Sequence, residues 1–286
     1  MRELPLHEIR RLVGEALRED IRSGDATTTS VVPAETRSCA QMVTRETMVV
    51  AGIGFAIAAF QSLDPEVVFR DVVPDGARLM AGTSLMKVTG SSRGLLTAER
   101  TALNFVQRLS GVATATAAFV DAIAGTRARV LDTRKTTPGW RALEKYAVVC
   151  GGGVNHRHGL DDLILIKDNH LAALHGASPN PVAAAVARAR AAFPYLKVEV
   201  EADTLEQVSH ALSAGADIIL LDNMSPVQLA AAVSLCAGRA KTEASGGVRL
   251  ETVRSIADTG VDFISVGAIT HSVRAIDIGL DFDPVA

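Results

Sequence analysis

The chain has 286 residues, of which 48% are hydrophobic and 21% charged, and its formal net charge is −3. This length suffices for one large domain or two ordinary ones with a substantial core. A slightly acidic chain has no general electrostatic attraction for nucleic acid, so any positive patch must be local and is expected to line a pocket. No run approaches the roughly 18 apolar residues that span a bilayer. The first residues lack the apolar segment of a signal peptide.

The three cysteines are Cys39, Cys150 and Cys236, which lie far apart and form no CxxC motif. An odd number of isolated cysteines favours reduced thiols and a cytoplasmic protein. We expect Cys150 to be a buried thiol rather than a nucleophile.

The first part of the chain predicts a small α+β domain. Between Leu6 and Leu17, apolar residues fall on one face of a helix, and a polar loop follows. From Cys39 to Val88 the chain contains short strand patterns separated by turn residues. A long helical stretch rich in alanine and leucine then begins at Leu95, with Arg100 in its first turns. We expect this helix to break near Ser110 and Gly111 and the domain to change in this region.

After Arg129, strand and helix patterns alternate, which predicts βαβ units and a parallel sheet. Helical runs span Pro181 to Ala192, Thr204 to Ala214, Pro226 to Cys236 and Leu250 to Thr259. Because no unit repeats another in sequence, a barrel is favoured over a solenoid. The β-rich runs are six: "ARVLDTRK", "DLILIKDNH", "LKVEVEAD", "DIILLDN", "KTEASGG" and "VDFISVGA".

Each of these runs ends in a polar or glycine-rich element. In an α/β barrel, reactive groups come from the carboxyl ends of several strands. We therefore expect six strand ends to converge on one mouth; their residues are Lys135, Lys167, Glu201, Asp222, Ser245 and Gly267.

Two of the strand ends carry carboxylates. Glu199 and Glu201 share one face of their strand and are expected to point into the barrel. For Glu199 we favour a structural ion pair, and for Glu201, nearer the mouth, a functional role. Asp222 ends the next apolar run; it could instead cap the following helix, but Ser225 suits that position better. Glu201 and Asp222 are hard oxygen ligands that suit Mg²⁺ completed by substrate phosphates.

Glycine-rich loops and cations suggest that the mouth binds anions. "ASGGV" and "VGA" follow the last two strands, where such barrels usually bind phosphate through backbone amides. Arginine and lysine recognise carboxylates and phosphates as a planar fork and as a point charge, respectively. The cations that gather at strand ends or beside glycines are Arg134, Lys135, His156, Arg157 and Lys167, and they predict a small polyanionic ligand.

The pair His156 and His158 also raises the alternative of a barrel metal hydrolase. Such a pair normally follows an apolar strand, whereas this one follows "GGGVN". Arg157, between the two histidines, would oppose a nearby metal cation. The hypothesis of a metal hydrolase is therefore disfavoured. For His170 in "KDNH", an orienting hydrogen bond is the simpler role.

A long, ordered series of motifs resembles the quinolinate phosphoribosyltransferase family, also called nicotinate-nucleotide pyrophosphorylase (carboxylating). The match runs from about Glu19 to Gly279. Trp140, Cys150 and Thr242 depart from the pattern without removing a charged site group. The matching motifs are "ERTALNFVQRLSGVATAT", "DTRKTTPGWRALEKYAV", "GGGVNHRHGLDD", "LIKDNH", "VEVEAD", "LLDN", "EASGG" and "GVDFISVGA".

The resemblance implies a fold and a reaction. The fold is an N-terminal α/β sandwich over residues 1–111 and an open, irregular α/β barrel over residues 112–271, with the tail 272–286 packed on the first domain. The reaction converts quinolinate and phosphoribosyl pyrophosphate to nicotinate mononucleotide, CO₂ and pyrophosphate in NAD biosynthesis. Alternatives are a paralogue associated with molybdate transport genes, the metal hydrolase, and a non-catalytic binder of small molecules.

The resemblance also implies roles for individual residues. Arg134, His156, Arg157 and Lys167 bind the quinolinate carboxylates, and Lys135 lies near the phosphoribosyl group and pyrophosphate. Glu201 and Asp222 bind Mg²⁺, partly through substrate and water, and with Lys135 form the catalytic set. Arg100 crosses a two-fold interface into the pocket of a partner subunit, so a homodimer is expected, and further assembly is left open. Thr133, Ser245, Gly246, Gly247, Val266, Gly267 and Ala268 complete the substrate contacts.

Overall fold

The computed structural model describes residues 4–283 and divides the chain into two compact units. Of the described residues, unit 1 contains 4–117, the segment Ala142–Gly152 and 272–283. Unit 2 contains Ala118–Arg141 and Gly153–His271. In the described part, no helix is long and apolar enough to cross a membrane.

Unit 1 is built on an antiparallel four-stranded sheet in the order β12-β1-β5-β3. Buried and less buried residues alternate along β1, so that Ala40, Met42 and Thr44 face the core. The last strand of the chain pairs with β1, from Ala40 opposite Phe282 to Thr44 opposite Ile278. The strands are β1 (Arg37–Thr44), β3 (Val68–Arg70), β5 (Ser84–Ser91) and β12 (Ile278–Phe282), with a separate pair β2 (Met48–Val49) and β4 (Arg78–Leu79).

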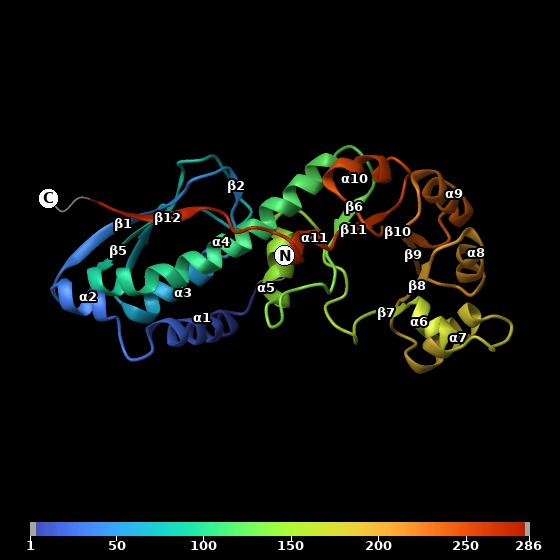
Figure 1. The fold of residues 1–286 in the computed structure, drawn as a ribbon, viewed down its shortest axis with the longest axis horizontal. Coiled ribbons are helices and arrows are strands. Elements are labelled where there is room, and N and C mark those ends of the chain that lie inside the picture. The colour runs from blue at the N-terminus through green and yellow to red at the C-terminus, as the bar shows by residue number, and fades with distance from the viewer. Residues whose placement is uncertain (1–3, 284–286) are drawn as a thin grey trace. The chain divides into compact units, whose positions relative to one another are not determined.

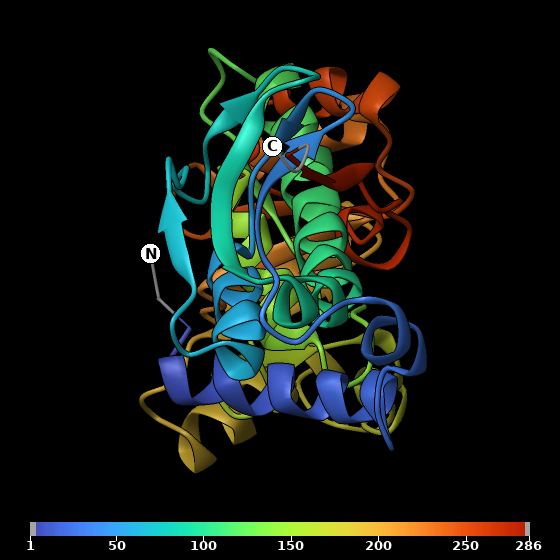
Figure 2. The same ribbon diagram turned by 90° about the vertical axis from the view of Figure 1, so that its left-hand side faces the viewer.

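Helices α3 and α4 pack against one another beside this sheet (Figure 1, Figure 2). Phe55 of α3 stacks on Phe105 of α4 with ring centroids 4.7 Å apart. The helix predicted from Leu6 is α1, and it extends to Ile21 with Val13 and Leu17 buried. The helices of this part of the chain are α1 (Leu6–Ile21), α2 (Ala26–Val31), α3 (Ile53–Leu63), α4 (Ser92–Ala122) and α5 (Arg141–Cys150).

The predicted break at Ser110 and Gly111 is wrong, because α4 runs without interruption through both residues. Both are buried and serve packing instead. The Ser110 hydroxyl accepts a hydrogen bond from the backbone N–H of Ala51 at 3.0 Å. A Cβ atom at Gly111 would overlap the carbonyl oxygen of Arg274, so glycine allows a close backbone approach there.

Unit 2 contains six parallel strands in the order β6-β11-β10-β9-β8-β7. All six β-rich runs predicted from the sequence form strands of this sheet. No pairing joins the end strands β6 and β7 in the described residues, so the barrel is open. The strands are β6 (Arg129–Leu131), β7 (Ile164–Ile166), β8 (Val198–Ala202), β9 (Ile218–Asp222), β10 (Lys241–Ser245) and β11 (Phe263–Ser265).

Helices follow the strands in order, and each contacts the next from α6 to α10 (Figure 1). Their starts are fixed by side-chain caps: Asn180, Thr204 and Ser225 each accept a hydrogen bond from the first helical turn. Ser225 is thus the cap that leaves Asp222 available for the site, as predicted. The helices are α6 (Asp168–Ala172), α7 (Pro181–Ala192), α8 (Leu205–Ser213), α9 (Pro226–Cys236), α10 (Leu250–Ala257) and α11 (Ala268–His271).

Candidate active site

Two cavities lie at the carboxyl ends of the strands in unit 2. The first has a volume of about 300 Å³ and the second about 530 Å³, which is the size range of small-molecule sites. Thr133, Lys135, Lys167, Ser245 and Ser265 line both cavities, so the two adjoin. The first is lined further by Arg134, His156, Arg157, Leu165, Leu220 and Glu243; the second by Glu201, Asp222, Asn223, Gly246, Gly247, Val248, Arg249, Gly267, Ala268 and His271.

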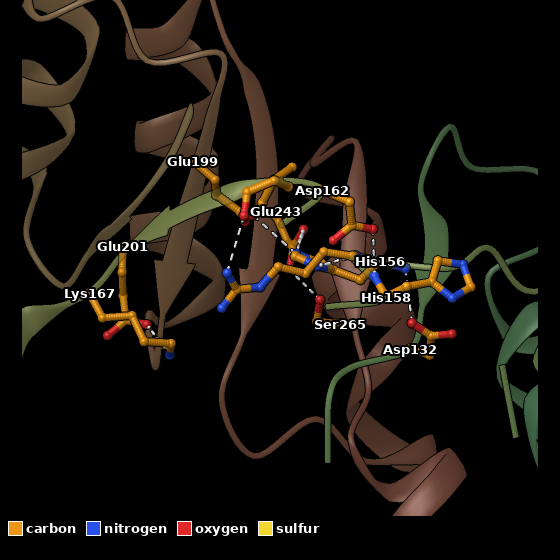
Figure 3. Close-up of polar contacts among 11 residues, drawn as sticks. Asp132, His156, His158, Asp162, Lys167, Glu199, Glu201, Glu243 and Ser265 are labelled. Carbon is orange, nitrogen blue, oxygen red and sulfur yellow. Dashed lines mark hydrogen bonds and ion pairs between the residues drawn. The ribbon is translucent and has the colours of Figure 1, made fainter. Parts of the chain in front are cut away.

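A buried carboxylate organises the loop that brings His156 to the first cavity. Asp132, directly after β6, is fully buried. It accepts hydrogen bonds from the backbone N–H of His156 at 2.9 Å and from the side-chain amide of Asn155 at 2.6 Å (Figure 3). The Arg157 backbone N–H then donates to His156 Nδ1 at 2.7 Å. This loop holds its polar side chains through backbone contacts, which preorganises them for a ligand.

Two guanidinium groups contribute positive charge to the first cavity, which Lys135 and Lys167 also line. Burial above all, and then the neighbouring Arg134, lower the pKa of Arg157 below its usual range. The Nε–H group of Arg134 is buried and has no hydrogen-bond partner among the described residues. Two cations held close together, one with a buried free donor, suit a ligand with carboxylate groups.

The second cavity combines carboxylates with glycines. Lys167 Nζ lies 2.7 Å from Glu201 Oε2 at the ends of β7 and β8. Asp222 ends β9 and accepts a hydrogen bond from the Asn223 side-chain amide at 2.6 Å. The carboxylates of Glu201 and Asp222 are hard oxygen donors, and such donors fit Mg²⁺.

The loop after β10 has the backbone shape of an anion cradle. Gly246 and Gly247 have φ values of 96° and 58°, which disfavour other residues. A Cβ atom at Gly246 would also lie 2.9 Å from the backbone nitrogen of Asn223. Successive N–H groups in such a turn can point at a phosphate.

Most of the residues predicted for the site line one of the two cavities. Two do not: Val266 is buried, and Arg100 is exposed on α4 in unit 1. His158 is exposed, and its backbone N–H donates to Asp162. It does not belong to the cluster that contains His156, so the proposed pair of histidine ligands has no geometric support in the described residues.

The structure also brings residues to the site that the sequence analysis missed. Glu243 and Ser265 line the first cavity, and Arg249 and His271 line the second. For Glu243 a signal was present, because it shares a strand face with Ser245, as Glu199 does with Glu201. His271 and Arg249 follow no strand directly, and nothing in their local sequence distinguishes them.

The fold and site together define an α/β-barrel protein whose two adjoining cavities are suited to anionic ligands. Residues 25–110 match the family model described as quinolinate phosphoribosyl transferase, N-terminal domain, and residues 112–281 match the model of its C-terminal domain. The chain belongs to the quinolinate phosphoribosyltransferase family.

Relatives and solved structures agree with this assignment. The chain is 50% identical over 280 residues to nicotinate-nucleotide pyrophosphorylase [carboxylating] of Mycobacterium leprae, covering 95% of this chain and 96% of the relative. It is 41% identical to the probable Bacillus subtilis enzyme of the same name, covering 96% and 93%. The Francisella tularensis nicotinate-nucleotide pyrophosphorylase structure superimposes with a TM-score of 0.92 at 41% identity, covering 98% of each chain.

Proposed function

We propose that this protein is a quinolinate phosphoribosyltransferase that converts quinolinate and phosphoribosyl pyrophosphate to nicotinate mononucleotide, CO₂ and pyrophosphate in the de novo synthesis of NAD. The observation that carries the proposal is the pairing of two cavities. One presents Arg134, His156 and Arg157, and the adjoining one presents carboxylates and a glycine turn. A pyridine dicarboxylate fits the first set, and a phosphorylated sugar fits the second.

The residues would act by holding two polyanions in contact. Arg134 and Arg157 bind the carboxylates of quinolinate and thereby aim the ring nitrogen toward the second cavity. Lys135 lines both cavities and can neutralise charge where the substrates meet. The nitrogen then attacks C1 of the ribose while the bond from C1 to the pyrophosphate oxygen breaks. No protein nucleophile is required, so catalysis rests on orientation and electrostatics.

Glu201 and Asp222 would hold Mg²⁺ at the second cavity, partly through water and substrate oxygens. The bound ion would supply positive charge that stabilises the departing pyrophosphate. Gly246, Gly247 and Ser245 would hold the 5′-phosphate through backbone and hydroxyl donors, with Gly267 and Ala268 at the amino end of α11 beside them.

The direct test is product formation from purified protein. Quinolinate, phosphoribosyl pyrophosphate and Mg²⁺ should give equal amounts of CO₂ and nicotinate mononucleotide. Chelation of the metal should abolish turnover. Nicotinate should be a poor substitute, because it leaves the cations that face the 2-carboxylate unpaired. Turnover of nicotinate at a rate comparable to quinolinate would contradict the proposal, as would product formation in the presence of a chelator.

We further infer that the active form is a homodimer. The family resemblance gives Arg100 a role in substrate binding. Arg100 is exposed on α4 and lines neither cavity of its own chain, which supports a role in the site of a partner subunit. The three cysteines are all free thiols, which supports a cytoplasmic location for the reaction.

A further inference from the structure

Two carboxyl groups and one imidazole meet beneath the first cavity. Glu199 of β8 and Glu243 of β10 are 0% and 1% exposed. Nε2 of His156 lies 3.0 Å from Glu199 and 3.5 Å from Glu243, and the Ser265 hydroxyl donates to Glu243 (Figure 3). Of these groups, Glu243, His156 and Ser265 line the cavity in which quinolinate is proposed to bind.

The hydrogen-bond geometry limits how much charge this cluster can carry. His156 Nδ1 accepts a hydrogen bond from the Arg157 N–H, so the hydrogen of the neutral imidazole lies on Nε2. That single hydrogen faces two carboxyl groups. An oxygen of Glu199 and an oxygen of Glu243 lie within 4.8 Å of one another. Two buried carboxyl groups this close are not both ionised, as in the acid pairs of other enzymes. One carboxyl group must therefore retain a proton.

We assign this proton to Glu243, because it lines the first cavity and Glu199 does not. Burial, and after it the charge of Glu199, raise the pKa of Glu243 to about 8, against the opposing effects of His156 and Ser265. The elements packed around it contribute Glu199 from β8, His156 from the loop before β7, and Ser265 from β11. Leu220 of β9, which is opposite Glu243 in the sheet, adds no charge.

The proposed reaction requires one proton that neither substrate supplies at the reacting carbon. Quinolinate carries a carboxylate at ring C2, where the product carries hydrogen. Resting on the proposed function, we propose that the carboxylic acid of Glu243 donates the proton that replaces this carboxylate. Glu243 thus becomes a catalytic acid in addition to the cations that bind the substrate.

The step balances without a further reactant. After ribosyl transfer, the bond between C2 and the carboxylate breaks, CO₂ leaves, and the electron pair stays on C2 beside the positively charged ring nitrogen. The O–H bond of Glu243 then breaks and a C–H bond forms at C2. Glu243 remains as a carboxylate beside the Ser265 hydroxyl and His156, and it regains a proton from solvent before the next turnover.

Replacement of Glu243 separates protonation at C2 from the earlier ribosyl transfer. Glu243→Gln keeps the shape but offers no transferable proton. We expect the rate of nicotinate mononucleotide formation to fall by about 10²–10⁴-fold, the usual contribution of a general acid. A rapid-quench experiment should still show a pyrophosphate burst equal to the enzyme concentration, and quinolinate mononucleotide should accumulate. Quinolinate affinity, measured by calorimetry, should stay within about threefold, because a hydrogen-bond donor is retained.

The matched control is Glu251→Gln, the same change at an exposed position of α10 in the same unit. It should behave as the unaltered protein. If the unaltered protein makes no nicotinate mononucleotide, the proposed function fails. If the unaltered protein is active and a folded Glu243→Gln variant is equally fast, or loses the pyrophosphate burst with quinolinate binding, the role of Glu243 as acid is refuted.

The unaltered protein provides a second test that does not depend on the folding of a variant. The active form of Glu243 is protonated. The rate of product formation should therefore be maximal below the pKa of Glu243 and fall about tenfold per pH unit above it. The amplitude of the pyrophosphate burst should persist across that range, because ribosyl transfer precedes the protonation step. Burial and the charge of Glu199 raise the pKa of Glu243 to about 8. A product rate that stays independent of pH above this value would overturn the inference.

Discussion

At the scale of single residues, Lys135 and Arg157 allow binding and chemistry to be separated. Lys135 lines both cavities, whereas Arg157 lines the first and not the second. We expect Lys135→Ala to lower kcat by about 10²–10³-fold, because it removes a charge near the leaving group. Arg157→Ala should instead weaken quinolinate binding by about 30-fold or more, or about 2 kcal/mol, because the bound carboxylate loses its partner.

Calorimetric titration of quinolinate, together with steady-state rates, measures both effects. Lys197→Ala, at an exposed lysine just before β8, is the control and should change neither quantity. If Lys135→Ala abolished quinolinate binding and Arg157→Ala did not, the roles of the two cations would be reversed.

The same scale shows what local sequence could predict about the site. Residues directly after strands, such as Glu201 and Asp222, follow from the strand pattern because parallel strands end at one edge. Glu243 was missed because it lies inside a strand, where a carboxyl group is expected only if something compensates for its burial. Its compensating partners, His156 and Ser265, come from other elements, and sequence spacing does not indicate their approach.

At the scale of elements, α4 offers a direct test of packing at a helical glycine. Gly111→Ala places a Cβ atom against the Arg274 carbonyl oxygen, a backbone atom that cannot move alone. We expect a loss of about 1–3 kcal/mol in the free energy of unfolding, measured by urea denaturation.

Gly14→Ala in α1 is the matched control, because the nearest atom to its added Cβ is the Arg18 Nη1 atom at 3.6 Å. It should stabilise the protein by about 0.5–1 kcal/mol through helix propensity. If both substitutions changed the free energy of unfolding equally, the close backbone approach at Gly111 would make no contribution to stability.

The packing at Gly111 also explains why a break in α4 was predicted incorrectly. Within a sequence window, a glycine after a serine indicates the end of a helix. Here the cause of the glycine is a tertiary contact with residue 274, which lies far along the chain. The helices from Pro181 and Pro226 were predicted with their correct ends, since their caps and apolar periodicity are encoded locally.

At the scale of the whole molecule, the alternation of strands and helices was sufficient to predict the parallel sheet of unit 2. Local patterns did not predict which segments of the chain belong to unit 1. The segment Ala142–Gly152 belongs to it, although it lies between strands of unit 2 in the sequence. Tyr146 in this segment donates a hydrogen bond to Asp75 at 2.6 Å, a contact that no periodicity indicates.

The proposed dimer yields a prediction at this scale. If Arg100 completes the site of a partner subunit, Arg100→Ala and Lys167→Ala homodimers should each lose activity by about 10²-fold or more, because every site lacks one positioning group. In a mixed dimer, two-fold symmetry places both defects in one site and neither in the other.

Mixing the two inactive proteins should therefore restore activity without any new residue. With random exchange of equal amounts, half of the dimers are mixed and each has one intact site, so activity should reach about one quarter of the unaltered protein. Native mass spectrometry of one isotope-labelled variant would verify that subunits exchange. If exchange is complete and activity stays absent, Arg100 acts within its own chain or has no catalytic role, since only a site shared between subunits can be repaired by this pairing.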